Sequence, residues 1–504
     1  MGVLILVVLT LIITIGVRSL KPQRQLPPGP NFIQLIWDVL QFPHMAASER
    51  IKKWSQKYGP ILSFGFGTRT MIVLGNRSTA NALFVRKSPN FSNRPDFIFL
   101  NKYIFKSLMP IFMPYDHHWQ AMNRERMVLM SPRNSKAYRQ VQSLTARYLL
   151  FTMLQGGDLG ARFAAYAQNL TSTLLYGTDI GSLRPIDIQQ LSFLLENVKS
   201  SACLENVLVD VLPFIENLPG VSNFLARRAE PLSEGFMQYS EKKLESALQR
   251  PSWNMASAFR QLDGEKLAWK AFCVSLCEIE IGASATTPMA MSIITKMIAS
   301  HPQEARKLQA EIDRVVGTKR LPTFDDLECL PGLQSFVKES LRLRTIAPLN
   351  VPHSVSCEDE YMGYRIPKGA LIFANQWAMN MDESVFEDPL SFKPERWLLN
   401  PSLPSPSLFG FGKRACPGQT ISTNTVSIAV ASMIWAFDFD DNENTEKSGR
   451  PPSLFDEGPQ ITGVRVRCRS PSHAALIERE WLATNPDPSI ELDKIGRVLG
   501  VEMK

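Results

Sequence analysis

A short glycine-rich run that carries one cysteine, near the C-terminal end of the chain, limits the possible folds more than any other feature. Residues 409–418 read Phe-Gly-Phe-Gly-Lys-Arg-Ala-Cys-Pro-Gly. Glycine lets the main chain adopt positive φ angles and approach a large flat ligand closely. A thiolate needs nearby positive charge or N–H donors to stay ionised, and Lys413 and Arg414 can also pair with anionic groups. The run therefore predicts a loop that presents Cys416 to a bound group, rather than a cysteine packed as a small apolar side chain.

The same run resembles the haem-binding loop of the cytochromes P450. The family pattern F-x-x-G-x-R-x-C-x-G is met at Phe409, Gly412, Arg414, Cys416 and Gly418. The resemblance implies haem b as the cofactor and Cys416 as the axial thiolate ligand of its iron, with Phe409, Arg414 and Gly418 binding the cofactor from the same loop. A thiolate ligand pushes electron density toward the iron and favours cleavage of the O–O bond.

Composition and patterning predict one large catalytic domain. The chain has 504 residues, of which 44% are hydrophobic and 20% charged, and no Gly/Ser linker, long charge run or repeat divides it. The stretch 135–320 is mostly helix-patterned, with a long apolar helix expected over 265–300, while Pro60–Gly67 and Thr70–Gly75 read as a β-hairpin. We expect a mainly α fold with small β-sheets over residues 31–504, which is the cytochrome P450 fold that the resemblance implies.

The N-terminus reads as a membrane anchor. Residues 2–17 are uncharged and almost wholly apolar, and basic residues follow at positions 18, 21 and 24. Because a bilayer-spanning helix needs about 20 residues, we expect an anchor helix over 1–20 and a proline-rich hinge over 21–30. A cleaved signal peptide is the alternative, but no positive charge precedes the apolar run and no A-x-A site follows it. The basic residues place the catalytic domain in the cytosol, and similarity to microsomal members implies a single-pass protein of the endoplasmic reticulum membrane.

The cysteines and the net charge exclude several functional classes. The seven cysteines are odd in number and scattered, and no C-x-x-C pair occurs, which argues against a structural zinc site and for a reducing compartment. The net charge is +7, and no interleaving of aromatic and basic residues indicates a nucleic-acid partner. We interpret the excess as a basic patch for an acidic redox partner, which the resemblance identifies as NADPH-cytochrome P450 reductase.

A second motif predicts a structural triad of charged residues. Glu339 and Arg342 lie three residues apart and therefore share one face of a helix. The run 392–397 adds Arg396 in a motif similar to the family's P-E-R-F, with Trp397 in place of phenylalanine. The resemblance implies that Glu339, Arg342 and Arg396 form a buried triad that holds the core around the haem loop.

The long apolar helix also carries the residues expected on the oxygen side of the haem. The family pattern A/G-G-x-D/E-T-T aligns best with residues 282–287, Gly-Ala-Ser-Ala-Thr-Thr, which Pro288 follows. The resemblance makes Thr286 the catalytic hydroxyl that passes protons to dioxygen, but Ala285 stands where the family has an acid. Pro288 has no N–H to donate to the carbonyl of Ser284, so we expect the helix to open there.

Three further residues are expected to bind the haem propionates beside Arg414. Trp119 matches the tryptophan of the family's W-x-x-x-R, but Asn123 holds the arginine position, so we assign the role to the next residue, Arg124. His353 stands where relatives place a basic residue against a propionate. A lone histidine is more often structural, and that alternative stays open for His353.

Family topology places the substrate beside four segments that are mostly apolar and aromatic. Such a lining suits a bulky, weakly polar ligand, and the segments are Phe97–Phe112, Ile281–Thr287, Ala347–Val351 and Ile461–Gly463. The runs 310–317 and 321–326 are similar to fungal enzymes of the O-methylsterigmatocystin oxidoreductase type. That similarity implies a natural-product intermediate of secondary metabolism as the substrate.

The function that these resemblances imply is a membrane-anchored haem-thiolate monooxygenase, which inserts one oxygen atom from O2 with electrons from NADPH. Oxidative coupling that closes a ring is a variant within the same class, since Ala285 removes the usual acid. A haem-thiolate isomerase or dehydratase that uses no O2 is the alternative from a different class. A non-catalytic haem sensor has no regulatory domain in the sequence to support it.

Overall fold

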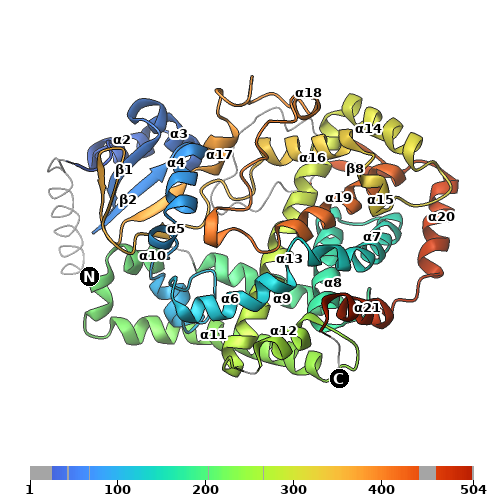
Figure 1. The fold of residues 1–504 in the computed structure, drawn as a ribbon, viewed down its shortest axis with the longest axis horizontal. Coiled ribbons are helices and arrows are strands. Elements are labelled where there is room, and N and C mark those ends of the chain that lie inside the picture. The colour runs from blue at the N-terminus through green and yellow to red at the C-terminus, as the bar shows by residue number, and fades with distance from the viewer. Residues whose placement is uncertain are drawn as a thin grey trace.

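Helices form most of the described protein, and a small sheet lies at one end (Figure 1). The computed structural model describes residues 25–42, 45–66, 68–201, 204–264, 266–441, 461 and 463–501. The predicted anchor over 1–20 and the first part of the predicted hinge, 21–24, lie outside these residues. Among the residues that are described, no helix has the length and apolar character needed to cross a bilayer.

The elements follow one another from helix and hairpin through a long helical region to a mixed C-terminal part. The α-helices are α2 (Phe32–Gln41), α3 (Ala47–Tyr58), α4 (Arg77–Ala80), α5 (Ser88–Phe91), α6 (His117–Leu129), α7 (Arg139–Leu154), α8 (Leu159–Tyr176), α9 (Pro185–Ser200), α10 (Leu204–Val211), α11 (Val221–Leu248), α12 (Met255–Asp263), α13 (Trp269–Ser300), α14 (Pro302–Val315), α15 (Phe324–Leu327), α16 (Pro331–Leu343), α17 (Gln376–Asn380), α18 (Arg396–Leu399), α19 (Gln419–Ala436), α20 (Pro471–Leu482) and α21 (Ser489–Leu499). The strands are β1 (Ile61–Phe66), β2 (Arg69–Leu74), β3 (His353–Ser354), β4 (Asp359–Tyr361), β5 (Tyr364–Ile366), β6 (Leu371–Ala374), β7 (Phe437–Asp441) and β8 (Val464–Cys468). Short 3-10 and π-helical segments are η1 (Asn81–Arg86), η2 (Ile98–Ile104), η3 (Asn134–Tyr138), η4 (Pro213–Asn217) and η5 (Gly412–Arg414).

The predicted hairpin forms one half of a four-stranded sheet with the order β1-β2-β6-β3. Strands β1 and β2 pair antiparallel, with Ile61 opposite Leu74, and β6 joins β2 in parallel. The described part of the hinge lies against β1, because the carbonyls of Pro27 and Pro28 accept hydrogen bonds from Ser63. A Cβ at Gly29 would come within 1.8 Å of the Ser63 carbonyl oxygen, so only glycine fits this contact.

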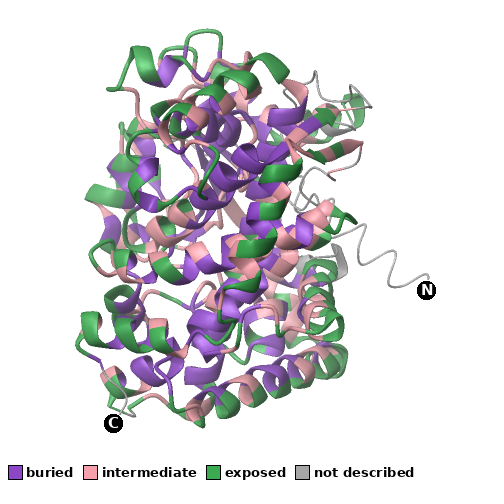
Figure 2. Ribbon diagram, turned by 90° about the vertical axis from the view of Figure 1, so that its right-hand side faces the viewer, coloured by how far each residue is buried: buried purple, intermediate pink, exposed green. Residues whose placement is uncertain are grey.

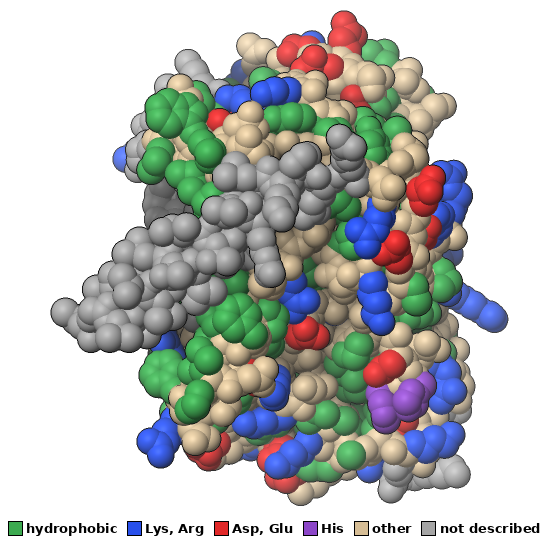
Figure 3. All heavy atoms as spheres, turned by 90° about the vertical axis from the view of Figure 1, so that its left-hand side faces the viewer, with side chains coloured by type: hydrophobic (Ala, Val, Ile, Leu, Met, Phe, Trp, Pro, Cys, Tyr) green, Lys and Arg blue, Asp and Glu red, His purple; other side chains and the backbone are tan. Residues whose placement is uncertain are grey.

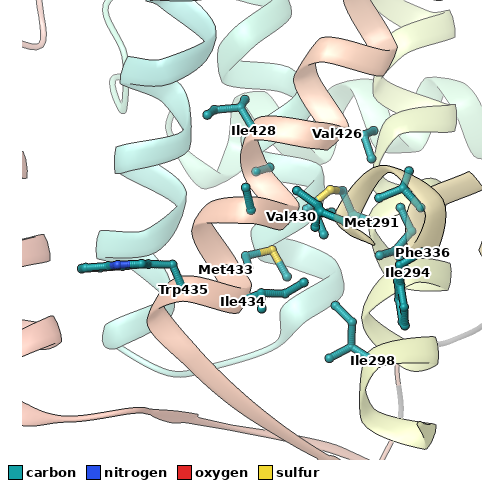
Figure 4. Packing of buried hydrophobic residues seen from close by; sticks show 14 of the residues in the cluster. Met291, Ile294, Ile298, Phe336, Val426, Ile428, Val430, Met433, Ile434 and Trp435 are labelled. Carbon is teal, nitrogen blue, oxygen red and sulfur yellow. The ribbon is translucent and has the colours of Figure 1, made fainter. Parts of the chain in front are cut away.

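The helical part is built around α13, the long apolar helix that the sequence predicts. α13 packs along α8, α16 and α19, and its buried side chains Met291, Ile294 and Ile298 meet Val430 and Met433 of α19 (Figure 4). Buried residues run through the centre of the molecule and exposed residues cover its periphery (Figure 2). The helix continues through Pro288, so the opening expected there does not interrupt it.

The last helix, α21, is part of the core rather than a surface appendage. Leu492 and Ile495 are buried in a hydrophobic cluster that also contains Met130, which touches the haem-loop motif at Gly418. The main-chain N–H of buried Trp253 donates to the Asp493 carboxylate at 2.9 Å. The C-terminal helix therefore supports the same core that supports the cysteine loop.

Gly496→Ala should destabilise the protein although alanine is the better helix former. A Cβ at Gly496 would lie 2.7 Å from Cδ1 of Trp253, and overpacking of this kind costs about 1–3 kcal/mol. Thermal unfolding measures the loss. Gly235→Ala in α11 is the matched control, because its Cβ would meet only Leu194 at 3.9 Å, and it should be neutral or stabilising by up to about 1 kcal/mol. Equal effects of the two substitutions would contradict the packing assigned to α21.

Candidate active site

The cysteine run forms a tight loop between η5 and the start of α19. The Cys416 N–H donates to the Phe409 carbonyl at 2.8 Å and closes the loop. Gly410 and Gly412 have φ angles of +72° and +57°, which side-chain-bearing residues rarely adopt. A Cβ at Gly412 would also lie 2.0 Å from the Phe84 carbonyl oxygen. Gly412 of the motif is therefore required by both conformation and space, and its neighbour Gly410 by conformation.

The sulfur of Cys416 is accessible although protein surrounds it. The side chain is exposed, yet burial is the largest influence on the thiol and raises its pKa. The Gly418 N–H and the positive charge of Arg126 act in the opposite direction. Protein atoms surround the thiol and weaken its solvation while part of its surface stays accessible. A positively charged metal at the sulfur would supply the charge that ionises it.

Arg414 and Trp119 are brought together as the sequence predicts. The guanidinium carbon of Arg414 lies 4.2 Å from the centre of the Trp119 ring, a cation–π contact. The same guanidinium donates three hydrogen bonds to main-chain carbonyls of Ser92, Pro110 and Met113. Trp119 itself is buried in the first turn of α6, where its main-chain N–H donates to the carboxylate of the N-cap residue Asp116.

Arg94 lies in the same group, and the sequence analysis did not identify it. Its side chain is buried and donates to the carbonyls of Ile111, Val351 and Pro352. Burial and the nearby charge of Arg414 lower its pKa well below the usual value. The position of Arg94 just before a proline was the only local signal, because the carbonyls that hold the side chain come from distant parts of the chain.

His353 is buried beside the two arginines and is held neutral. Burial, together with the charges of Arg94 and Arg414, lowers its pKa well below the usual value. Nδ1 lies 2.7 Å from the Phe91 carbonyl, which can only accept, so Nδ1 carries the proton and Nε2 is a buried acceptor without a partner. An anionic group placed nearby would raise this pKa and turn Nε2 into a donor.

The structure does not place Arg124 in the site. Arg124 is 62% exposed at its side chain and pairs with its neighbour Glu125 at 2.7 Å. Arg126 is buried instead, two turns after Trp119 on the same face of α6, and pairs with Glu278 of α13 at 2.6 Å. The helix period explains the correction, since positions seven apart share a face whereas positions five apart do not.

The charges of this group are unbalanced among the described residues. Arg94, Arg126 and Arg414 are largely buried, and Glu278 is the carboxylate that raises the pKa of Arg94 and Arg414. Asp116 also acts on Arg414, so three guanidinium groups face two carboxylates and positive charge is in excess. Buried charges are costly unless they are paired, so the site fits an anionic ligand.

The oxygen-side motif lies in the middle of α13. Thr286 and Gly282 are both accessible, whereas Ser284 and Thr287 on the other face are buried. The Thr286 hydroxyl donates to the Gly282 carbonyl at 2.8 Å, so its oxygen keeps free lone pairs for a further partner. Ala285 brings no carboxylate to this stretch of the helix.

The predicted triad residues meet around Glu339. Arg342 and Arg396 both donate to its carboxylate, at 2.8 and 3.0 Å, and all three side chains are at least nine-tenths buried. Trp397, which replaces the phenylalanine of the family motif, donates its indole N–H to the same carboxylate at 3.0 Å. The triad joins α16 to the start of α18. Among the described residues, no hydrogen bond joins the triad directly to the cysteine loop.

Aromatic side chains gather where the substrate is expected. Phe97 and Phe105 both contact Phe112, with ring centres 4.9 and 6.0 Å apart, and Phe105 also meets Phe236 of α11. The same cluster includes the partly buried Ile281 of α13. Leu349 is buried against the sheet instead, and Thr462 lies outside the described residues.

Comparison with known proteins agrees with this geometry. The family model for cytochrome P450 matches residues 27–457. Cytochrome P450 monooxygenase aneD of Aspergillus aculeatus is 34% identical, with 91% of both chains covered, and cytochrome P450 monooxygenase FrzL of a Cladobotryum species is 32% identical, covering 95% of this chain and 94% of that one. Fumitremorgin C synthase of Neosartorya fischeri is 30% identical over 93% of each chain. A zebra fish cytochrome P450 solved with abiraterone has the same fold, with a TM-score of 0.68 at 21% identity, covering 84% of this chain and all of that one.

Haem b, the cofactor of this family, fits the site. Its anionic propionates suit a site with an excess of buried positive charge, and the accessible sulfur of Cys416 would provide a thiolate ligand for iron. Gly412, which leaves no room for a Cβ, keeps the loop in the conformation that presents this sulfur. The sequence, the fold and the site agree, and the chain belongs to the cytochrome P450 family of haem-thiolate monooxygenases.

Proposed function

We propose that this protein inserts one oxygen atom from O2 into a bulky, weakly polar natural-product intermediate of fungal secondary metabolism. The observation that carries the proposal is the accessible Cys416 beside buried arginines whose charge is not balanced. Haem, when bound, supplies the oxygen chemistry of the family. The relatives named as monooxygenases and as Fumitremorgin C synthase are fungal, which supports the substrate class.

We assign the site residues to separate tasks. Cys416 binds the iron, and the loop residues Phe409 and Gly418 fix the position of its sulfur. Arg414, with Trp119 stacked on it, binds the anionic edge of the haem together with Arg94 and His353. Arg126 is the third cation of this edge and is oriented by Glu278.

Thr286 holds the proton on the oxygen side. Its hydroxyl donates to the Gly282 carbonyl. When this hydrogen bond breaks, the hydroxyl can donate its proton to a neighbouring oxygen atom and accept another proton from water. Because Ala285 has no acidic group, water or a group on the substrate must bring the proton to this hydroxyl. Ring closure by oxidative coupling stays the second candidate within the same class, since Ala285 is the feature that favours it.

Oxygen consumption tests the class of reaction. The holoenzyme, reduced by NADPH through a purified cytochrome P450 reductase, should take up O2. An isomerase or dehydratase would convert a peroxide with neither NADPH nor O2. Absence of NADPH-driven uptake together with peroxide conversion would overturn the proposal.

Thr286→Ala should keep haem binding but lower product formation by about 100- to 10,000-fold, the usual range for a general acid–base group. Consumed NADPH should appear as hydrogen peroxide, which a coupled peroxidase assay measures. Ser192→Ala is the matched control, because Ser192 also donates to the carbonyl four residues earlier, on exposed α9, and should leave turnover unchanged. If Thr286→Ala formed as much product per NADPH consumed as the unaltered protein, the alignment of α13 with the family's oxygen-side motif would be incorrect.

We also propose attachment to the endoplasmic reticulum membrane through residues 1–20, with the catalytic domain in the cytosol. Large apolar side chains are exposed on α2, namely Ile33, Trp37 and Leu40, and others on α9, η4 and α11, namely Phe193, Phe214 and Phe224. Hydrophobic side chains gather on the face that carries α2 (Figure 3). These side chains support contact of this face with lipid. Recovery of the full-length protein in the soluble fraction of cells would contradict the proposal.

A further inference from the structure

Asp210, near the C-terminal end of α10, joins two elements that are distant in sequence. Its carboxylate accepts the N–H of Ile98, the first residue of η2, and also faces the N–H of Phe99. The main chain of the same turn is held by the β1–β2 hairpin, since the Asp210 carbonyl accepts from Arg69 and the Val211 carbonyl from Thr68. One turn of α10 therefore contacts both η2 and the hairpin.

A second contact joins η2 to η4, the short helical segment that follows α10. Glu216 of η4 accepts hydrogen bonds from the ammonium of Lys102 at 2.5 Å and from the hydroxyl of Tyr103 at 2.7 Å. Lys102 and Tyr103 both belong to η2. Two acidic residues thus attach the segment from α10 to η4 to the first turn and to the last turn of η2. We call these two contacts, made by Asp210 and Glu216, the Asp210 latch.

The main chain beside the latch is strained. Phe97, directly before η2, has a φ of +43°, in the left-handed region that bulky residues rarely adopt. Such a conformation persists where the surroundings hold it, and such residues cluster at sites that move or bind ligands. The neighbouring Asp96 is held by Arg69 at 3.1 Å, so the strained residue is fixed on both sides.

The element held by the latch covers the substrate side of α13. Ile98, Phe99 and Ile104 of η2 are buried in one hydrophobic cluster with Val274 and Cys277 of α13. Ile281, one turn closer to Thr286, packs against the same cluster. Movement of η2 away from α10 would expose this cluster and change access to the oxygen side of the site.

We propose that Asp210 is a positioning residue that controls access to the substrate side of α13, by holding η2 against α10 in a closed arrangement. Glu216 contributes the second contact. Once the contact of Asp210 with Ile98 is lost, the strain at Phe97 favours movement of η2 away from α10. The groups that face the Asp210 carboxylate are Asp96, which precedes η2, and Arg69 on β2, with Lys102, Tyr103 and Glu216 at the other end of the latch.

The latch should respond to pH. Burial is the largest cause that raises the pKa of Asp210, to about 6, and Asp96 adds to it, while the N–H donors and Arg69 oppose it. An exposed aspartate has a pKa of about 3.9. The closed arrangement therefore binds the proton more tightly than the open one, so acidification through about pH 6 favours closure and higher pH favours opening.

The rate of ligand entry to the ferrous holoenzyme tests the latch. Two neutral haem ligands serve as probes, the bulky tert-butyl isocyanide and the small carbon monoxide. In the unaltered protein the isocyanide association rate should fall several-fold between about pH 7.5 and pH 5.5, and the carbon monoxide rate should change less. Asp210→Asn, which resembles the protonated side chain, should be slow at both pH values. Asp210→Ala, which removes the contact, should be fast at both.

Two further measurements separate the latch from a general effect on folding. Asp325→Asn changes an exposed aspartate of α15 in the same way and should behave as the unaltered protein. Hydrogen exchange of the full-length holoenzyme should show lower protection of the Ile98 and Phe99 amides in Asp210→Ala alone. Equal isocyanide rates in the two Asp210 variants would overturn the proposal, as would an absent or reversed pH dependence in the unaltered protein. If a variant retained no haem, the pH dependence and amide protection of the unaltered protein would decide.

Discussion

Cys416→Ser is expected to abolish the red-shifted Soret band of the ferrous–carbon monoxide complex and all NADPH-driven product formation. A serine hydroxyl stays protonated where a thiol bound to a metal ionises, so iron loses its anionic ligand. Loss of even an outer partner of a metal ligand typically costs about 10- to 100-fold, and loss of the ligand itself should exceed about 100-fold. Difference spectra and turnover with reductase measure the two effects.

The loop itself should survive the change. The N–H of residue 416 would still donate to the Phe409 carbonyl, and Arg94 and Arg414 would keep their main-chain acceptors. The variant should therefore retain its thermal stability without haem. Cys329→Ser and Cys357→Ser are matched controls, because both thiols are exposed and unpaired, and both variants should keep the band. If Cys416→Ser kept the red-shifted Soret band of a thiolate ligand, the assignment of Cys416 as the iron ligand would be wrong.

The parts of the site that the sequence predicted are those in which one local segment determines the outcome. The cysteine loop depends on glycines at positions 410 and 412, whose positive φ angles are a property of the residue type. The pair Glu339–Arg342 depends on helical spacing alone. Thr286 is accessible because the period of α13 turns it to the same side as Gly282.

The parts that the sequence did not predict depend on contacts between distant segments. Arg94 was missed because its acceptors lie near residue 111 and at residues 351 and 352. The motif alignment predicts Arg124, the residue after Asn123, because it carries no information on which face of α6 is buried, and the buried arginine is Arg126. The core position of α21 was also not foreseen, since it depends on the fit of Gly496 against Trp253, whose partner lies more than two hundred positions away.

The buried carboxylate of Glu339 should be essential for a folded, haem-containing protein. It is fully buried and accepts from Arg342, Arg396, the Lys393 N–H and Trp397. Burial alone would raise its pKa, but the hydrogen bonds and charge of Arg342 outweigh this, and the net pKa is lowered. The carboxylate is therefore ionised, and it is the counter-charge for two buried guanidinium groups.

Glu339→Ala should cost about 3–5 kcal/mol, because it leaves Arg342 and Arg396 buried without a counter-charge. The free energy of unfolding of a native protein is about 5–15 kcal/mol, so this loss is a large share of it. We expect the variant to be recovered largely without haem and to unfold at a clearly lower temperature. Trp397→Phe removes one hydrogen bond only and should cost about 0.5–1.5 kcal/mol.

Glu304→Ala is the matched control for Glu339→Ala. Glu304 also pairs with a cation three residues away, Lys307 at 2.7 Å, but that lysine is 72% exposed, and such pairs contribute about 0–1 kcal/mol. The two glutamates have the same sequence spacing to a cation and differ in burial, so the contrast between them tests the contribution of burial. If Glu339→Ala lost no more stability than Glu304→Ala, the two arginines would have to be compensated by main-chain carbonyls alone. Arg342 donates to the carbonyls of Asn380 and Pro389, and Arg396 to that of Glu387, so this outcome would assign the stability of the core to those carbonyl contacts instead of to the triad.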